Sequence, residues 1–172
     1  MTPRDQLIAA VCALALSGAV TAAQAGDEQP VMVNIKRLSL DTALKIAQAT
    51  IAACRKEGVQ IAVTVVDRGG HPQVVLRDVL AMDITLPVSR KKAHTAMAFN
   101  SPTSALEDRF KAPHSVGKLD SLIIAAGGVP ITAGGQIVGG VGVSGAPSGA
   151  TDEKCARAGV EAVRVDLEMA GS

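Results

Sequence analysis

The spacing of apolar side chains predicts that the chain begins its fold with a helix followed by a β-hairpin. Between residues 40 and 54 apolar side chains recur every three or four positions. Ser39 precedes them as a good N-cap, and Gly58 is expected to end the helix. β-branched runs at 60–67 and 73–77 then flank a glycine-containing turn, which is typical of a hairpin.

A glycine-rich stretch at 122–149, LIIAAGGVPITAGGQIVGGVGVSGAPSG, predicts two or three short strands of Ile and Val. Glycine pairs at 127–128 and 134–135 separate these strands, because positive φ costs little without a Cβ. In the last strand three glycines leave almost no side chain at several positions, so that a flat ligand or another backbone can approach closely. These glycines are Gly139, Gly140 and Gly142.

The remaining elements complete an α+β pattern. Helices are expected over Thr85–Phe99, over 101–110 with Ser101 as N-cap, and from Thr151 onward, and 31–37 is expected to form an edge strand. The order helix, hairpin, two helices, strands, helix indicates a single α+β domain with a central, mainly antiparallel sheet flanked by helices.

The first residues have the features of an export signal. A charged start precedes an apolar run at 7–16 that is too short to span a bilayer, and Ala23-Gln24-Ala25 fits a cleavage site. We therefore expect a periplasmic or secreted protein without stable membrane insertion; the alternative is a buried N-terminal helix. The expected division is a signal peptide at 1–25, a leader or edge segment at 26–37 and one domain at 38–172.

Removal of the signal peptide leaves two cysteines, Cys54 and Cys155. An oxidising compartment permits a disulfide between them. The favoured interpretation is nevertheless two unbonded core thiols, because the sequence does not say whether their helices touch.

Composition narrows the function classes. The formal net charge of +1 gives no electrostatic case for nucleic acid binding. Phe99 and Phe110 are the only aromatic residues, so the stacking platforms of single-strand binders are missing. A core of small aliphatic side chains favours further burial between subunits, and we expect a homo-oligomer.

Common catalytic and nucleotide-binding motifs find little support. Residues 140–145 match G-x-G-x-x-G, but Pro147 and Gly149 delay the helix that a dinucleotide site needs at its last glycine. Asp67 and Asp78 are more readily interpreted as turn caps or surface ion-pair partners than as an acid–base pair.

The segment with the most chemistry is RKKAHTAM at 90–97. On a helix, Arg90 and Lys91 share one face with His94, and Met97 lies one turn further on. An imidazole between cations and a thioether suits an anionic, iron-bearing macrocycle: propionates on Arg or Lys, iron on His and the ring edge on Met. Thr95 points about 100° away and offers a hydroxyl. The alternative is a solvated basic helix face with an incidental histidine.

Three segments carry a resemblance to a known family: SRKKAHTAMAFNSPTSAL, AAGGVPITAGGQIVGGVGVSGAPSG and DEKCARAGVEAV. They resemble the GlcG/HbpS-like haem-binding family, which includes the C-terminal domain of PduO-type corrinoid adenosyltransferases. The resemblance runs from about Leu38 to the C-terminus. It implies a profilin-like layout around an antiparallel sheet and assembly into dimers and often octamers.

The resemblance also bears on the site residues. Where the family has K-A-x-T-A, Lys92 and Thr95 match and His94 fills the variable position. His94 as iron ligand is thus an inference from its chemistry, whereas Thr95 is the matched but weaker ligand. The expected metal ligands are His94 and Thr95, and the expected cofactor-binding residues are Arg90, Lys91, Lys92, His94, Thr95 and Met97.

Three hypotheses for function follow. The first is an exported, oligomeric, non-catalytic haem-binding protein for haem or iron handling or redox sensing, with a corrinoid or another planar anion as the alternative ligand. The second is a small-molecule or haem-degrading enzyme of the GlcG type, associated with glycolate utilisation, with a pocket near Pro147 and a role for Asp152. The third is an accessory partner of a sensor system.

Overall fold

The computed structural model describes residues 30–112 and 116–171. The expected signal peptide lies outside this range. Residues 35–172 form one compact unit, which carries the sheet and all the helices described below. The edge strand expected at 31–37 is wrong, because these residues form no strand and are exposed. Among the described residues no helix is long and apolar enough to cross a membrane.

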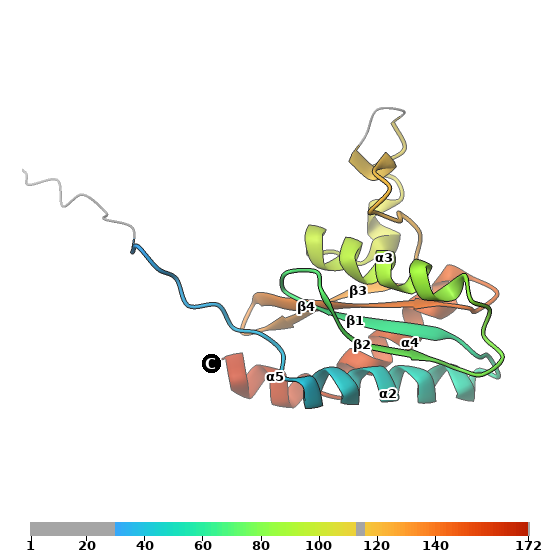
Figure 1. The fold of residues 1–172 in the computed structure, drawn as a ribbon, viewed down its shortest axis with the longest axis horizontal. Coiled ribbons are helices and arrows are strands. Elements are labelled where there is room, and N and C mark those ends of the chain that lie inside the picture. The colour runs from blue at the N-terminus through green and yellow to red at the C-terminus, as the bar shows by residue number, and fades with distance from the viewer. Residues whose placement is uncertain (1–29, 113–115, 172) are drawn as a thin grey trace, which may run out of the picture. The chain divides into compact units, whose positions relative to one another are not determined.

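Four antiparallel strands form the central sheet (Figure 1). They are β1 (Ala62–Asp67), β2 (Pro72–Arg77), β3 (Gly128–Ala133) and β4 (Gln136–Ser144), in the order β2-β1-β4-β3. The strand β1 is buried along its whole length because helices cover both faces of the sheet. The α+β architecture with an antiparallel sheet is therefore confirmed.

Helices cover the two faces of the sheet unequally. The helix α3 (Thr85–Phe99) lies on one face, over β4, β1 and β3. On the other face lie α2 (Leu40–Lys56) and α4 (Gly149–Glu161), followed by α5 (Arg164–Gly171) (Figure 1). The main apolar core fills the space between the sheet and this second layer, and its largest fully buried members are Ile46, Ile61 and Ile131.

Glycines bring α3 unusually close to the sheet. A Cβ on Gly142 would overlap the carbonyl oxygen of Ser89, and a Cβ on Gly140 would overlap that of Ala93. The expectation that another backbone approaches the thinned strand is confirmed. Since α3 covers these glycines, the G-x-G-x-x-G match at 140–145 has a packing explanation.

The glycine pairs play two different roles. Gly134 and Gly135 have φ values of +55° and +76° and join β3 to β4 as a two-residue turn, which needs positive φ at both positions. The pair at 127–128 is no hairpin, because Gly128 already belongs to β3 and residues 122–126 form no strand. The stretch thus contains two strands.

The helix α2 begins where the sequence predicts, whereas the helix expected over 101–110 does not form. Ser39 caps α2 by accepting a hydrogen bond from the Thr42 N–H at 3.2 Å. The helix expected over 101–110 is only a short 3-10 turn, Thr103–Leu106. Side chains of this turn make hydrogen bonds to distant residues. The Ser104 hydroxyl donates to Glu153, and the Thr103 hydroxyl accepts from the Gly128 N–H.

The C-terminal helix differs from the expectation in two ways. It begins at Gly149 with Ser148 as N-cap, and it breaks at residues 162–163 into α4 and α5. A disulfide between Cys54 and Cys155 ties α4 to α2, with a Cα–Cα distance of 5.4 Å. The favoured interpretation of two unbonded thiols was therefore wrong.

Candidate functional site

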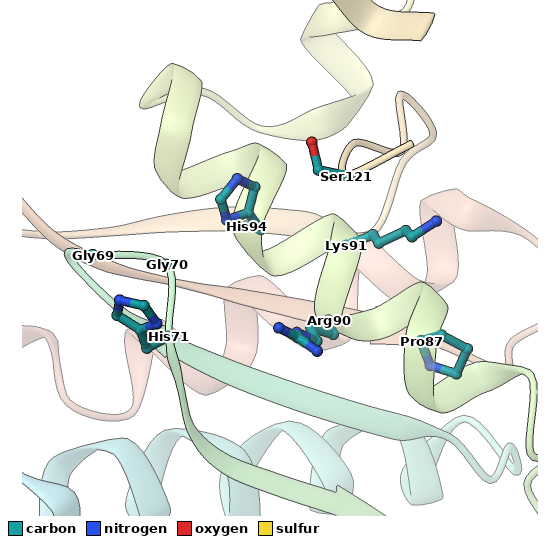
Figure 2. A pocket seen from close by; sticks show the side chains of 8 residues that line it. All are labelled: Gly69, Gly70, His71, Pro87, Arg90, Lys91, His94 and Ser121. Atoms are coloured by element: carbon teal, nitrogen blue, oxygen red, sulfur yellow. The ribbon is translucent and has the colours of Figure 1, made fainter. Parts of the chain in front are cut away.

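A cleft of about 360 Å³ opens where the turn between β1 and β2 faces α3. Figure 2 shows its lining: the turn supplies three residues, α3 supplies four, and the loop after a second short 3-10 turn, Val116–Lys118, supplies one. These residues are Gly69, Gly70, His71, Pro87, Arg90, Lys91, His94 and Ser121.

The helix α3 presents its contribution along one face. Arg90 and Lys91 lie three and four residues after Pro87 and four and three residues before His94, the intervals that bring side chains together on a helix. Arg90 is exposed, whereas Lys91 and His94 are half-buried. The expected grouping of these two cations with His94 is what the structure shows.

The β1–β2 turn adds His71, a second imidazole that the sequence patterns did not single out. The Asp67 carboxylate organises this turn, because one of its oxygens accepts from the N–H groups of Gly69 at 2.8 Å and His71 at 3.0 Å. Its other oxygen lies 3.3 Å from the Arg37 guanidinium. The only sequence signal for His71 is its place directly after a glycine pair, and the signal becomes informative once the turn is known to face α3.

His94 packs directly against this turn. Gly70 has φ +80°, and a Cβ placed on it would lie 2.6 Å from His94 Nδ1 and 3.1 Å from the terminal methyl carbon of Met97. Met97 therefore lies beneath the turn, beside His94, and is absent from the residues that line the cleft. His94 and Gly70 both line the cleft, which lies between α3 and the turn (Figure 2).

Comparison with known proteins decides the family. A sequence model of the family described as "Haem degrading protein HbpS-like" matches residues 38–161. The chain belongs to this family.

Similar proteins agree with this assignment. A crystal structure of HbpS is 39% identical with a TM-score of 0.73, covering 76% of this chain and 93% of that one. A crystal structure of a PduOC–haem complex is 25% identical with a TM-score of 0.69, covering 74% and 95%. Protein GlcG of Escherichia coli K12 is 33% identical over 105 residues, which is 58% of this chain and 78% of GlcG.

Lys92, which matches the family's K-A-x-T-A phrase, lies on the opposite side of α3 from the cleft. Its ammonium makes a buried ion pair with Asp152 at 2.9 Å, and the two side chains are 6% and 4% exposed. Burial raises the pKa of Asp152, against the lowering effect of hydrogen bonds from the Ala146 N–H and Lys92. Lys92 thus ties α3 to α4 and does not reach the cleft.

Thr95, the other matched position, is fully buried. Its hydroxyl donates to the Lys91 carbonyl at 2.8 Å and accepts from the Ile123 N–H at 3.1 Å. Both hydrogen-bonding roles of the hydroxyl are occupied within the fold, so Thr95 connects α3 to the segment before β3 and presents no group to the cleft.

The charge of the cleft favours an anionic ligand. Arg90 and Lys91 line it, and among the described residues no carboxylate does. The two cations repel a bare metal cation and attract carboxylates, to which guanidinium groups donate paired hydrogen bonds. In the described part of the chain no group of three or more His, Cys, Asp or Glu residues is placed to hold a metal ion.

Proposed function

We propose that this protein binds haem in the cleft between α3 and the β1–β2 turn. The observation that carries the proposal is the convergence of His94 and His71 with Arg90 and Lys91 around one cleft, whose lining in the described part of the chain contains no carboxylate. Membership of a family described as HbpS-like supports it, as does the similarity to a PduOC domain crystallised with haem.

The residues present fit the chemical demands of haem. An imidazole nitrogen of His94 would hold the iron, and Arg90 and Lys91 would bind the propionates through charge-assisted hydrogen bonds. His71 supplies a second imidazole at the same cleft. Bound haem supplies an iron centre capable of axial ligation and redox change. Lys92 and Thr95 have no direct part in this proposal, because both are buried in contacts of the fold.

A hemin titration of the mature protein tests the proposal. We expect a Soret shift at micromolar protein for the wild type, a large loss of affinity in His94→Ala, and weaker binding in Arg90→Ala. Lys45→Ala is the control, because Lys45 is exposed on α2, which covers the other face of the sheet. Absence of a Soret shift in the wild type would end the proposal, and a parallel titration with a corrinoid tests the alternative ligand.

His71→Ala decides which imidazole holds the iron. If His94 is the ligand, the hemin complex of His71→Ala keeps the same kind of absorbance spectrum as the wild type, and its affinity for hemin falls only modestly. If instead this spectrum disappears in His71→Ala and persists in His94→Ala, His71 in the turn is the iron ligand.

Turnover of haem is the second candidate function, and the family's description as haem-degrading favours it. It predicts that hemin bound to the wild type bleaches on addition of ascorbate, faster than free hemin and faster than in His94→Ala. A Soret band that persists under these conditions supports a binding protein without turnover. Asp152, the residue expected to act in an enzymatic role, is buried in an ion pair with Lys92 and joins α4 to α3.

We further propose that subunits associate through the loop between β2 and α3. Four large apolar side chains on this loop are more than 60% exposed, and it leads directly into Pro87 at the cleft. They are Val79, Leu80, Met82 and Ile84. Sedimentation of the wild type and of Leu80→Asp tests this association, and a monomeric wild type would refute it.

Export is also part of the proposal. The disulfide between Cys54 and Cys155 supports an oxidising compartment, where such bonds persist. N-terminal sequencing of protein from the periplasm or medium is expected to begin after Ala25. An accessory role beside a membrane sensor is tested by pull-down from membrane extracts with and without hemin.

A further inference from the structure

The turn between β1 and β2 is held by backbone hydrogen bonds and by the side chain of Asp67. The Gly70 N–H donates to the Asp67 carbonyl, and the Asp67 N–H donates to the His71 carbonyl, both at 2.9 Å. The Asp67 side chain adds two further bonds to the turn and is 10% exposed. These bonds fix the position of Gly70 relative to the end of β1.

Gly70 in turn limits where the His94 ring can lie. The two ring atoms nearest to a Cβ at this position are Nδ1 at 2.6 Å and Cε1 at 3.0 Å, so this edge of the imidazole packs on the turn. The other ring nitrogen, Nε2, is not among the three atoms nearest to that Cβ position, so it lies further from the turn than Nδ1. Any side chain at residue 70 would force the ring to rotate or shift, because real Cβ atoms do not approach this closely.

We infer that Gly70 is a positioning residue, which by packing against His94 selects Nε2 as the nitrogen offered to the ligand, and that Asp67 holds Gly70 in place. The inference rests on the proposed function in so far as the ligand is haem. The contact between Gly70 and His94 can nevertheless be tested in the protein without haem.

A pair of glycine substitutions separates this role from backbone strain. Gly70→Ala and Gly135→Ala each place an alanine in a turn that joins two antiparallel strands, at nearly the same φ, +80° and +76°. An added Cβ has no atom within 4 Å at Gly135, whereas at Gly70 it meets His94. Both variants suffer the cost of positive φ, and only Gly70→Ala displaces the imidazole.

Two measurements apply to both variants. In the haem-free protein, NMR is expected to show a displaced His94 ring-proton resonance in Gly70→Ala and an unchanged one in Gly135→Ala. His94→Ala identifies that resonance among the three histidines. With hemin, Gly70→Ala is expected to bind about two- to twelve-fold more weakly, the range that follows from an off-rotamer ring, with an altered ferric EPR spectrum.

The outcomes are distinguishable. If the His94 resonance and the hemin spectrum respond equally in the two variants, the positioning role is refuted. If the resonance moves only in Gly70→Ala but no variant and no wild type binds hemin, the positioning role stands and the proposed function fails. Should Gly70→Ala not fold, Gly70→Asn replaces it, because Asn tolerates positive φ better and still carries the Cβ.

Discussion

Replacing Lys92 and Lys91 separately by Met distinguishes a lysine of the fold from a lysine of the cleft. The two are neighbours on α3, but Lys92 is 5% exposed and paired with Asp152, whereas Lys91 lines the cleft. Lys92→Met leaves the Asp152 carboxylate buried with one remaining hydrogen bond, from the Ala146 N–H at 3.0 Å. Removing one partner of a buried pair costs about 3–5 kcal/mol.

That cost translates into a measurable melting shift. For a unit spanning residues 35–172, the unfolding entropy corresponds to about 0.3 kcal/mol per degree, so Lys92→Met is expected to melt roughly 10 to 17 °C lower. Lys91→Met is expected to melt within about 2 °C of the wild type, since substitutions away from buried contacts change stability by about 0.5 kcal/mol or less. Its hemin affinity should fall instead.

The assay is calorimetry and hemin titration of both lysine variants. Asp152→Asn and the double variant, Lys92→Met with Asp152→Asn, are measured in the same way. The double variant should recover part of the loss, because Asn leaves no buried charge without its partner. A Lys92→Met protein that melts like the wild type but binds hemin poorly would refute the structural role and restore Lys92 to the ligand site.

Three further predictions concern stability. Burial works to raise the pKa of Glu153, but hydrogen bonds from Arg157 and Ser104 outweigh it and lower that pKa below 4.5. The ionised Glu153 carboxylate therefore stabilises the fold above this pH, and that stabilisation is lost as the pH falls. Glu153→Gln should show a shallower decline of Tm with acidification below pH 4.5. The disulfide closes a separation of 101 residues, so its reduction should cost about 2–5 kcal/mol in urea unfolding, and an unchanged midpoint would contradict this. Gly142→Ala should destabilise by about 3 kcal/mol or more or fail to fold, because its Cβ meets the α3 backbone, whereas Gly135→Ala should lose only about 1–2 kcal/mol.

Local patterns predicted most elements of the fold because each depends on neighbouring residues. Ser39 and the apolar spacing after it define α2, and Gly134-Gly135 define the β3–β4 turn. The expected helix over 101–110 failed where distant partners decide the structure, since Ser104 and Thr103 bond to α4 and β3. The Cys54–Cys155 disulfide likewise depends on the packing of two helices 101 residues apart in sequence.

The candidate site was predictable on α3 and not beyond it. Helical spacing alone groups Arg90, Lys91 and His94, and about 100° per residue places Lys92 on the far side from His94. Lys92 and Thr95 were nevertheless included, because they match the family phrase. His71 was not, because only the packing of α3 on the sheet brings the β1–β2 turn beside this helix.

The two sides of α3 separate the contacts of the fold from the lining of the cleft. Lys92 and Thr95, the positions that match the family phrase, face inward and bind α3 to α4 and to the segment before β3. His94, at the variable position of that phrase, faces the cleft. A change at residue 94 therefore alters the cleft without breaking the contacts that hold the helix on the sheet. It follows that substitutions at residue 94 test the ligand of the cleft, whereas substitutions at Lys92 and Thr95 test the packing of α3.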